Sequence, residues 1–104
     1  MKGTELLKKS VKVNEKHILK LFVTGTTPNS VRAIVNLKRI CEEYLCDNYE
    51  LEIIDIYQQP QLAQLEQILA APVLVKKSPL PVRKLIGDMS NKQKVLKGLG
   101  LESK

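Results

Sequence analysis

Tryptophan is absent from this 104-residue sequence, which contains one phenylalanine, three tyrosines and a single histidine. Because proteins that bind single-stranded nucleic acids stack bases on exposed aromatic side chains, this composition does not favour a nucleic-acid-binding function. The only histidine, His17, has no cluster of further histidines or cysteines in the sequence, so we expect no metal site. We predict that His17 lies at a strand edge near solvent, and we expect no cofactor.

Long apolar segments are also lacking. The first sixteen residues contain no apolar core of signal-peptide length, and no apolar run is long enough to cross a bilayer. We therefore expect no membrane segment and a cytoplasmic location.

Cysteine is scarce, with only Cys41 and Cys46 present. They are five positions apart in a predicted helix, and at about 100° per residue they point about 140° apart around its axis. This spacing excludes a local pair. We predict that Cys41 is a small core residue on the apolar face and that Cys46, near the helix end, is partly exposed.

Charge and length define the domain organisation. The formal net charge is +6, which favours acidic partners because a positive field attracts anionic ligands. Five lysines fall within the first sixteen residues, and we interpret residues 1–16 as a flexible basic arm. Residues 17–104 then form a single domain, since this length supports one core and 43% hydrophobic with 27% charged residues is typical of globular proteins.

The first half of the domain has a strand-helix-strand pattern. Residues 17–24 are almost continuously apolar, as in a central strand covered on both faces. After the loop 25–30, in which Asn29 or Ser30 is placed to cap a helix, apolar residues recur at helical spacing. The predicted inward positions of this helix are Val31, Ile34, Leu37, Cys41, Tyr44 and Leu45. Residues 49–55 form the second strand, which we expect to lie parallel to the first.

The second half predicts a short helix, two strands and a final helix. Pro60 is placed as a first helical residue, and strands at 73–76 and 82–86 form a hairpin. Ser90 is the predicted N-cap of the last helix, with Gly98 and Gly100 limiting its length.

This order, β-α-β-α-β-β-α with a proline before the third strand, predicts a thioredoxin-like α/β fold. We expect a mixed four-stranded sheet with helices on both faces. Thioredoxin-like oxidoreductases carry a Cys-x-x-Cys pair between the first strand and first helix, where the helix terminus lowers the thiol pKa. The corresponding loop here, residues 25–30, contains no cysteine. Dithiol exchange is therefore excluded at this position, and nothing else in the sequence specifies an enzyme.

Three stretches of the sequence resemble the KaiB family. They are Leu19–Gly25 with Thr27–Ala33, then Ile54 and Asp55 with residues 60–63, and Pro81–Asp88. The resemblance implies a non-enzymatic clock regulator that docks on the ATPase ring of KaiC and competes there with a sensor kinase. A thioredoxin-like protein of a stress or redox response, acting through other partners, is the alternative. Cyanobacterial members continue into an aromatic and then acidic tail, whereas this sequence ends at Lys104, so we expect weak KaiC binding.

The resemblance also implies two folds and a set of binding residues. Family members adopt the thioredoxin-like monomer or a rearranged tetrameric ground state, so we expect a homo-oligomer, dimer or tetramer, in the unbound state. The residues that would permit a switch are Pro72, Pro79, Pro81, Gly87, Gly98 and Gly100. The residues that match partner-binding charges of the family are Lys20, Arg32, Lys76 and Arg83, with Lys84 beside them.

Overall fold

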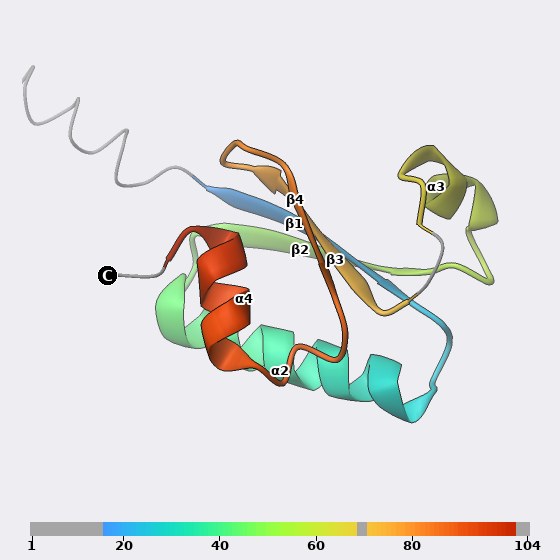
Figure 1. The fold of residues 1–104 in the computed structure, drawn as a ribbon, viewed down its shortest axis with the longest axis horizontal. Helices are drawn as coiled ribbons and strands as arrows, with labels where there is room; N and C mark the ends of the chain where they lie inside the picture. Colours follow the sequence, from blue (N-terminus) through green and yellow to red (C-terminus); the bar gives the residue numbers. More distant parts are fainter. Residues whose placement is uncertain (1–15, 69–70, 102–104) are drawn as a thin grey trace, which may run out of the picture.

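The computed structural model of the chain describes residues 16–68 and 71–101. Its elements are β1 (His17–Val23), α2 (Pro28–Tyr44), β2 (Tyr49–Asp55), α3 (Pro60–Leu65), β3 (Val73–Ser78), β4 (Arg83–Ile86) and α4 (Lys92–Leu99) (Figure 1). The predicted order of strands and helices is therefore confirmed. The predicted basic arm lies outside the described residues except for Lys16, whose Nζ is 3.1 Å from Glu50 Oε2.

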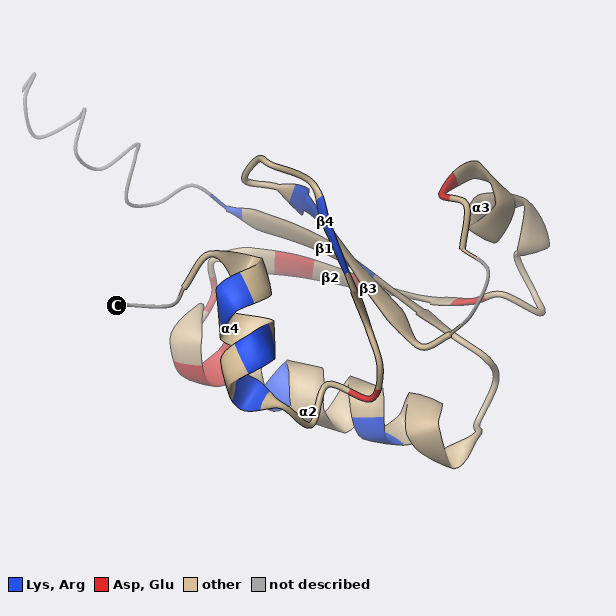
Figure 2. Ribbon diagram, in the orientation of Figure 1, with Lys and Arg blue, Asp and Glu red and all other residues tan. Residues whose placement is uncertain are grey.

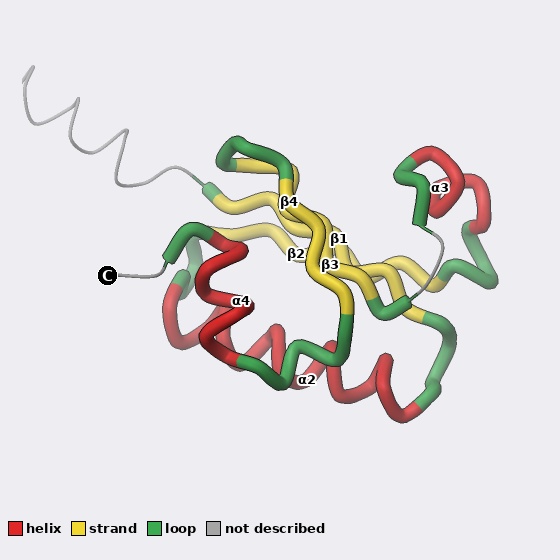
Figure 3. Tube along the Cα trace, viewed as in Figure 1, coloured by secondary structure: helices red, strands yellow, loops and turns green. Residues whose placement is uncertain are grey.

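The four strands form one mixed sheet in the order β2-β1-β3-β4 (Figure 3). β1 pairs with β2 in parallel and with β3 antiparallel, and β3 pairs with β4 antiparallel. At the centre of the sheet, Leu21 of β1 lies between Ile53 of β2 and Leu74 of β3. The hairpin of β3 and β4 and the helix that follows it agree with the thioredoxin-like arrangement and not with the rearranged alternative.

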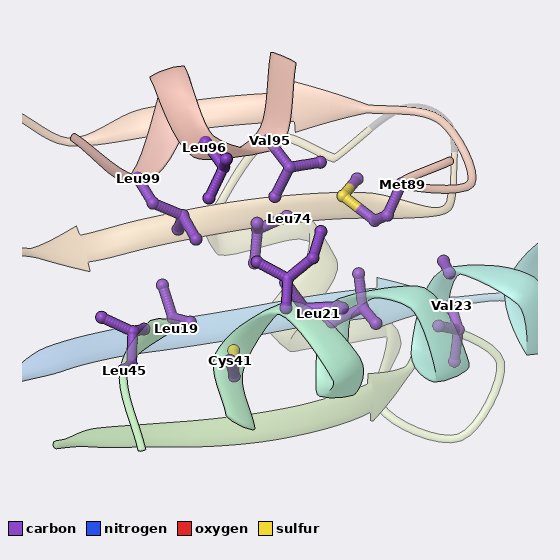
Figure 4. Packing of buried hydrophobic residues seen from close by; sticks show 13 residues of the cluster. Leu19, Leu21, Val23, Cys41, Leu45, Leu74, Met89, Val95, Leu96 and Leu99 are labelled. Carbon is purple, nitrogen blue, oxygen red and sulfur yellow. The ribbon is translucent and has the colours of Figure 1, made fainter. Parts of the chain in front are cut away.

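Helices cover both faces of the sheet, as predicted (Figure 1). Because side chains alternate along a strand, neighbouring residues of β1 enter different cores. Leu19 and Leu21 pack with α2 and α4 on one face (Figure 4). Phe22 packs on the other face, where Ala63 belongs to α3. None of the helices in the described ranges has the length and apolar character needed to cross a membrane.

The start of α2 differs from the sequence prediction. Thr27 is the N-cap, with its side chain accepting a hydrogen bond from Ser30 N, and Pro28 follows as a first-turn residue. Neither Asn29 nor Ser30 caps the helix. Proline fits this first turn because its missing N–H has no helical partner there. Ser30 is instead buried inside the helix, where its Oγ accepts a hydrogen bond of 3.0 Å from Thr24 N.

The buried face of α2 is also rotated relative to the prediction. Its buried residues are Ser30, Ala33, Leu37, Ile40 and Cys41. Leu37, Cys41 and the following Leu45 were predicted correctly, whereas Val31 and Tyr44 are exposed. Apolar residues of this helix offer two alternative stripes, and the stripe that begins at Ala33 packs with Leu19 and Leu21 of β1.

The final helix, α4, is capped by Asn91 and not by Ser90. Asn91 Oδ1 accepts a hydrogen bond of 3.1 Å from Lys94 N. Gly100 is the C-cap with φ of 78°, a left-handed conformation that glycine adopts without steric cost. Gly98 does not end the helix, since it is buried within α4 against Leu85 of β4.

His17 lies in a different environment from the one predicted. It is 7% exposed, and its Nε2 lies 2.9 Å from the carbonyl oxygen of Leu99 at the end of α4. Because a carbonyl only accepts hydrogen bonds, Nε2 carries the proton and donates. His17 Nδ1 is buried without a hydrogen-bond partner in the described part of the chain. The prediction of a solvent-exposed strand edge is therefore wrong, because α4 covers the start of β1.

Candidate functional site

The loop between β1 and α2 is the position of the redox centre in thioredoxin-like enzymes, and here hydroxyl groups occupy it. Thr24 Oγ1 lies 3.2 Å from both Thr27 Oγ1 and Ser30 Oγ. Asp55 Oδ1, at the end of β2, accepts hydrogen bonds from Gly25 N at 3.3 Å and from Tyr57 N at 2.9 Å. These contacts hold the loop in place. The loop itself contains no thiol.

The two thiols lie elsewhere and are not a close pair. Both cysteines are free, Cys41 being buried and Cys46 exposed. Burial, with a smaller effect from the charge of Glu42, raises the pKa of Cys41 to about 12. The Cys41 thiol is therefore protonated at neutral pH, and a protonated thiol is a poor nucleophile. The predicted core position of Cys41 is confirmed.

The five basic residues singled out from the sequence do not form one cluster. The register of the sheet aligns Lys20 of β1 with Val75 of β3 and Lys84 of β4. Because Val75 belongs to the core on the α3 side, Lys20 and Lys84 lie on that face. Lys84 Nζ donates a hydrogen bond of 2.6 Å to the carbonyl oxygen of Glu66, next to α3.

Lys76 and Arg83 lie on the opposite face, which α2 and α4 cover. They are directly paired across β3 and β4. Lys76 is only 4% exposed, so this fold presents almost none of it to a partner, whereas Arg83 is exposed. Arg83 lines a groove together with Lys94 and Lys97 of α4. Sequence reasoning missed these two lysines, although their spacing of three residues places them on one side of a helix.

The fifth residue, Arg32, lies on α2 and joins it to the loop before α4. Its Nε is 3.1 Å from Asp88 Oδ2, and its terminal nitrogen contacts Asn29 Oδ1. Asn36 Nδ2 on the same helix donates a hydrogen bond of 3.0 Å to the carbonyl oxygen of Asp88. Arg32 is therefore already engaged in holding the loop that leads into α4.

The carboxylate of Asp88 provides a test of this loop geometry. Hydrogen bonds from the Ser90 hydroxyl and backbone N–H, and then from Arg32, lower the pKa of Asp88 below its ordinary value. We expect Ser90→Ala and Arg32→Ala each to raise the Asp88 pKa, measured by NMR titration of the carboxyl carbon.

The sign of the accompanying stability effect follows from this lowered pKa. The contribution of Asp88 is present above its unfolded pKa and is lost as the pH falls through the lower folded pKa. Lys38→Ala, on the exposed side of α2, serves as the control that leaves the titration unchanged. An Asp88 titration that neither Ser90→Ala nor Arg32→Ala moves would contradict these hydrogen bonds.

The residues predicted to permit a change of fold lie around the β3–β4 hairpin and α4. The peptide bonds preceding Pro72, Pro79 and Pro81 are all cis. Gly87 follows β4, and its N–H donates a hydrogen bond of 3.0 Å to the carbonyl oxygen of Pro72. The role of these prolines and of the three glycines in switching stays a prediction. Within residues 16–68 and 71–101, no group of histidine, cysteine, aspartate and glutamate side chains is arranged to hold a metal ion.

The geometry defines a thioredoxin-like domain without the thiol pair, and solved structures share its fold. Mitochondrial thioredoxin 3 of Saccharomyces cerevisiae superposes with a TM-score of 0.67 at 16% identity, covering 90% of this chain and 88% of that one. The N-terminal domain of Synechococcus elongatus SasA also has a TM-score of 0.67, at 26% identity, covering 86% of this chain and 89% of that one.

Sequence comparison gives the particular family. The KaiB domain model matches residues 20–101. The circadian clock oscillator protein KaiB of Synechococcus elongatus is 54% identical over 85 residues, which is 82% of this chain and 83% of the relative. The chain therefore belongs to the KaiB family, as the resemblance of its sequence motifs implied.

Proposed function

We propose that the chain is a non-enzymatic clock-type regulator that binds the ATPase ring of a KaiC-type partner. The observation that carries this proposal is the family match over residues 20–101, which includes nearly all of the described fold from β1 to α4. The absence of a thiol between Gly25 and Ser30 supports a role in binding over one in dithiol chemistry. The redox alternative is not favoured, since Cys41 is buried with a pKa raised to about 12.

The likeness to the SasA domain supports competition for a single site. That domain shares the fold of this chain at 26% identity, over 86% of this chain and 89% of the SasA domain. Two domains with the same arrangement of elements can dock in the same orientation, and two docked domains cannot share one position. We propose that this chain displaces a sensor kinase of the SasA type from KaiC.

Titration calorimetry of this chain into the Synechococcus elongatus KaiC ring tests the proposal. We expect saturable binding that an excess of the SasA N-terminal domain abolishes, because both occupy the same site. Nucleotide hydrolysis by KaiC is recorded in parallel. Failure to bind KaiC at 100 µM, about −5.5 kcal/mol of binding free energy, would contradict the proposed function.

The exposed arginine of β4 gives a matched test of the surface. Arg83→Ala is expected to weaken KaiC binding, whereas Lys38→Ala, which removes one positive charge from the exposed side of α2, leaves it unchanged. Equal effects of both substitutions would mean that net charge alone drives binding.

We also propose that the unbound chain associates into dimers or tetramers and operates in the cytoplasm. Sedimentation velocity over a range of concentrations tests the association, since a mass independent of concentration and equal to one chain would contradict it. The switch between folds proposed for the three prolines and three glycines is tested in the same samples by backbone chemical shifts of residues 92–99. A strand in place of α4 is expected in the oligomer.

A further inference from the structure

A groove runs along the outer edge of β4 beside α4. Its volume is about 610 Å³, within the roughly 300–1,000 Å³ range of ligand-binding pockets. Arg83 and Leu85, which face α4, line it together with Val82 and Lys84, which alternate with them toward the other face. Since residues of both faces reach the same groove, it follows the edge of the strand.

The edge itself is open to a further strand. β4 is the last strand of the sheet. Among the described residues, no backbone hydrogen bond outside the sheet involves Arg83–Ile86. Val82 is 51% exposed and Ile86 is 71% exposed, so neither end of β4 is covered. An unpaired edge presents N–H and C=O groups to which an extended chain can bind.

The charged side chains that line the groove are all positive. Its lining includes four cations, Arg83, Lys84, Lys94 and Lys97, and no acidic residue. Ion pairs in the described ranges involve Lys16, Arg32, Lys77 and Lys92 instead. Figure 2 shows Lys and Arg in blue on both β4 and α4, two elements that contact each other. Lys84 contacts the carbonyl oxygen of Glu66, which leaves Arg83, Lys94 and Lys97 as the charges available to a ligand.

We infer that this groove binds an extended acidic segment of a partner protein, which adds a strand to the free edge of β4. The main chain of the segment bonds to the edge, and its carboxylates meet Arg83, Lys94 and Lys97. The alternate apolar side chains of the segment point to the opposite face, where they contact Val82. A nucleic acid fits less well, because the groove has no aromatic side chain on which a base can stack.

The probe is a fluorescein-labelled peptide of eight residues that alternates glutamate with valine, added to the full chain without KaiC. We expect saturable anisotropy changes, with NMR amide shifts concentrated at residues 82–86 and 94–98. Binding weakens as salt is raised, because the carboxylates and cations are exposed. Since KaiC is absent, the outcome is independent of the proposed function.

Two controls separate strand addition from attraction between charges. Lys94→Glu with Lys97→Glu is expected to weaken binding about tenfold or more, equivalent to about 1.4 kcal/mol, while Lys38→Glu leaves the dissociation constant unchanged. The same peptide with N-methyl groups at alternate residues cannot complete the edge hydrogen bonds and is expected to bind at least about tenfold more weakly. Unchanged amide spectra away from the groove show that the variants remain folded.

Three results would overturn the inference. If the acidic peptide does not bind, the charges on β4 serve only to keep its exposed edge from pairing with other strands. Equal binding of the N-methylated and unmodified peptides would exclude strand addition as the mode of binding. Tighter binding of a single-stranded 12-nucleotide DNA than of the peptide, at the same salt concentration, would assign the groove to a nucleic acid.

Discussion

Phe22→Ala is expected to lower the free energy of unfolding by about 3–5 kcal/mol, the usual cost of truncating a buried phenylalanine. Phe22 is 0% exposed and packs against Ile54, Val73 and Val75, with Ala63 of α3. It is the largest buried side chain on the α3 side of the sheet. A cavity there removes the contacts that hold α3 against the strands, and urea unfolding followed by circular dichroism measures the loss.

An exposed residue of α3 supplies the control for this substitution. Leu65 is 78% exposed, so Leu65→Ala is expected to change stability by no more than about 0.5 kcal/mol. Phe22→Leu, which keeps most of the apolar volume, is expected to cost less than Phe22→Ala. A loss below about 1 kcal/mol for Phe22→Ala would contradict the close packing of this core.

Gly98→Ala is expected to destabilise the chain, although alanine is the better helix former by about 1 kcal/mol. A Cβ atom at Gly98 would lie 2.5 Å from Leu85 Cδ1 and 2.9 Å from Leu85 Cγ. Overpacking of this kind costs about 1–3 kcal/mol, so a net loss of up to about 2 kcal/mol remains after the gain in helix propensity. Thermal and urea unfolding both measure it.

Removal of Leu85 should reverse the sign of this effect. In the Leu85→Ala background the clash is gone, and Gly98→Ala is expected to stabilise the chain by about 1 kcal/mol through helix propensity alone. The double-mutant cycle therefore gives a coupling energy of about 1–3 kcal/mol between β4 and α4. Independent effects of the two substitutions would mean that α4 does not pack on β4 through Gly98.

Local sequence signals predicted the elements of the fold well. The apolar run at 17–24 gave β1, Pro60 marked the start of α3, and the two β-branched segments formed the β3–β4 hairpin. These features depend on residues that are close in sequence. The assignment of the family also followed from short motifs, since Thr27–Ala33 and Pro81–Asp88 fall within the matched region.

The errors arose where a residue depends on a distant part of the chain. His17 contacts Leu99, which is 82 positions away in the sequence, and no local pattern carries that information. The face of α2 was ambiguous because Val31 and Ala33 begin two different apolar stripes, and only packing on β1 selects between them. The cap of α2 was an avoidable error, because Pro28 at the first turn already pointed to Thr27.

The candidate binding residues were the least predictable part. Lys20, Lys76, Arg83 and Lys84 are close in the sheet, but the pairing register separates them onto two faces. Lys94 and Lys97 join Arg83 only because α4 folds back beside β4. The basic residues singled out from the sequence thus divide between two faces of the sheet.

The contact between His17 and Leu99 has a consequence for how the chain can be reconnected. It places the first residue of β1 beside the last residue of α4, with His17 Nε2 2.9 Å from the carbonyl oxygen of Leu99. Short links between adjacent ends are the usual requirement for circular permutation. The exposed turn around Leu80, between β3 and β4, then offers a place for new termini. In such a permutant, β4 and α4 would be made first, and the new linker would connect the end of α4 to the start of β1.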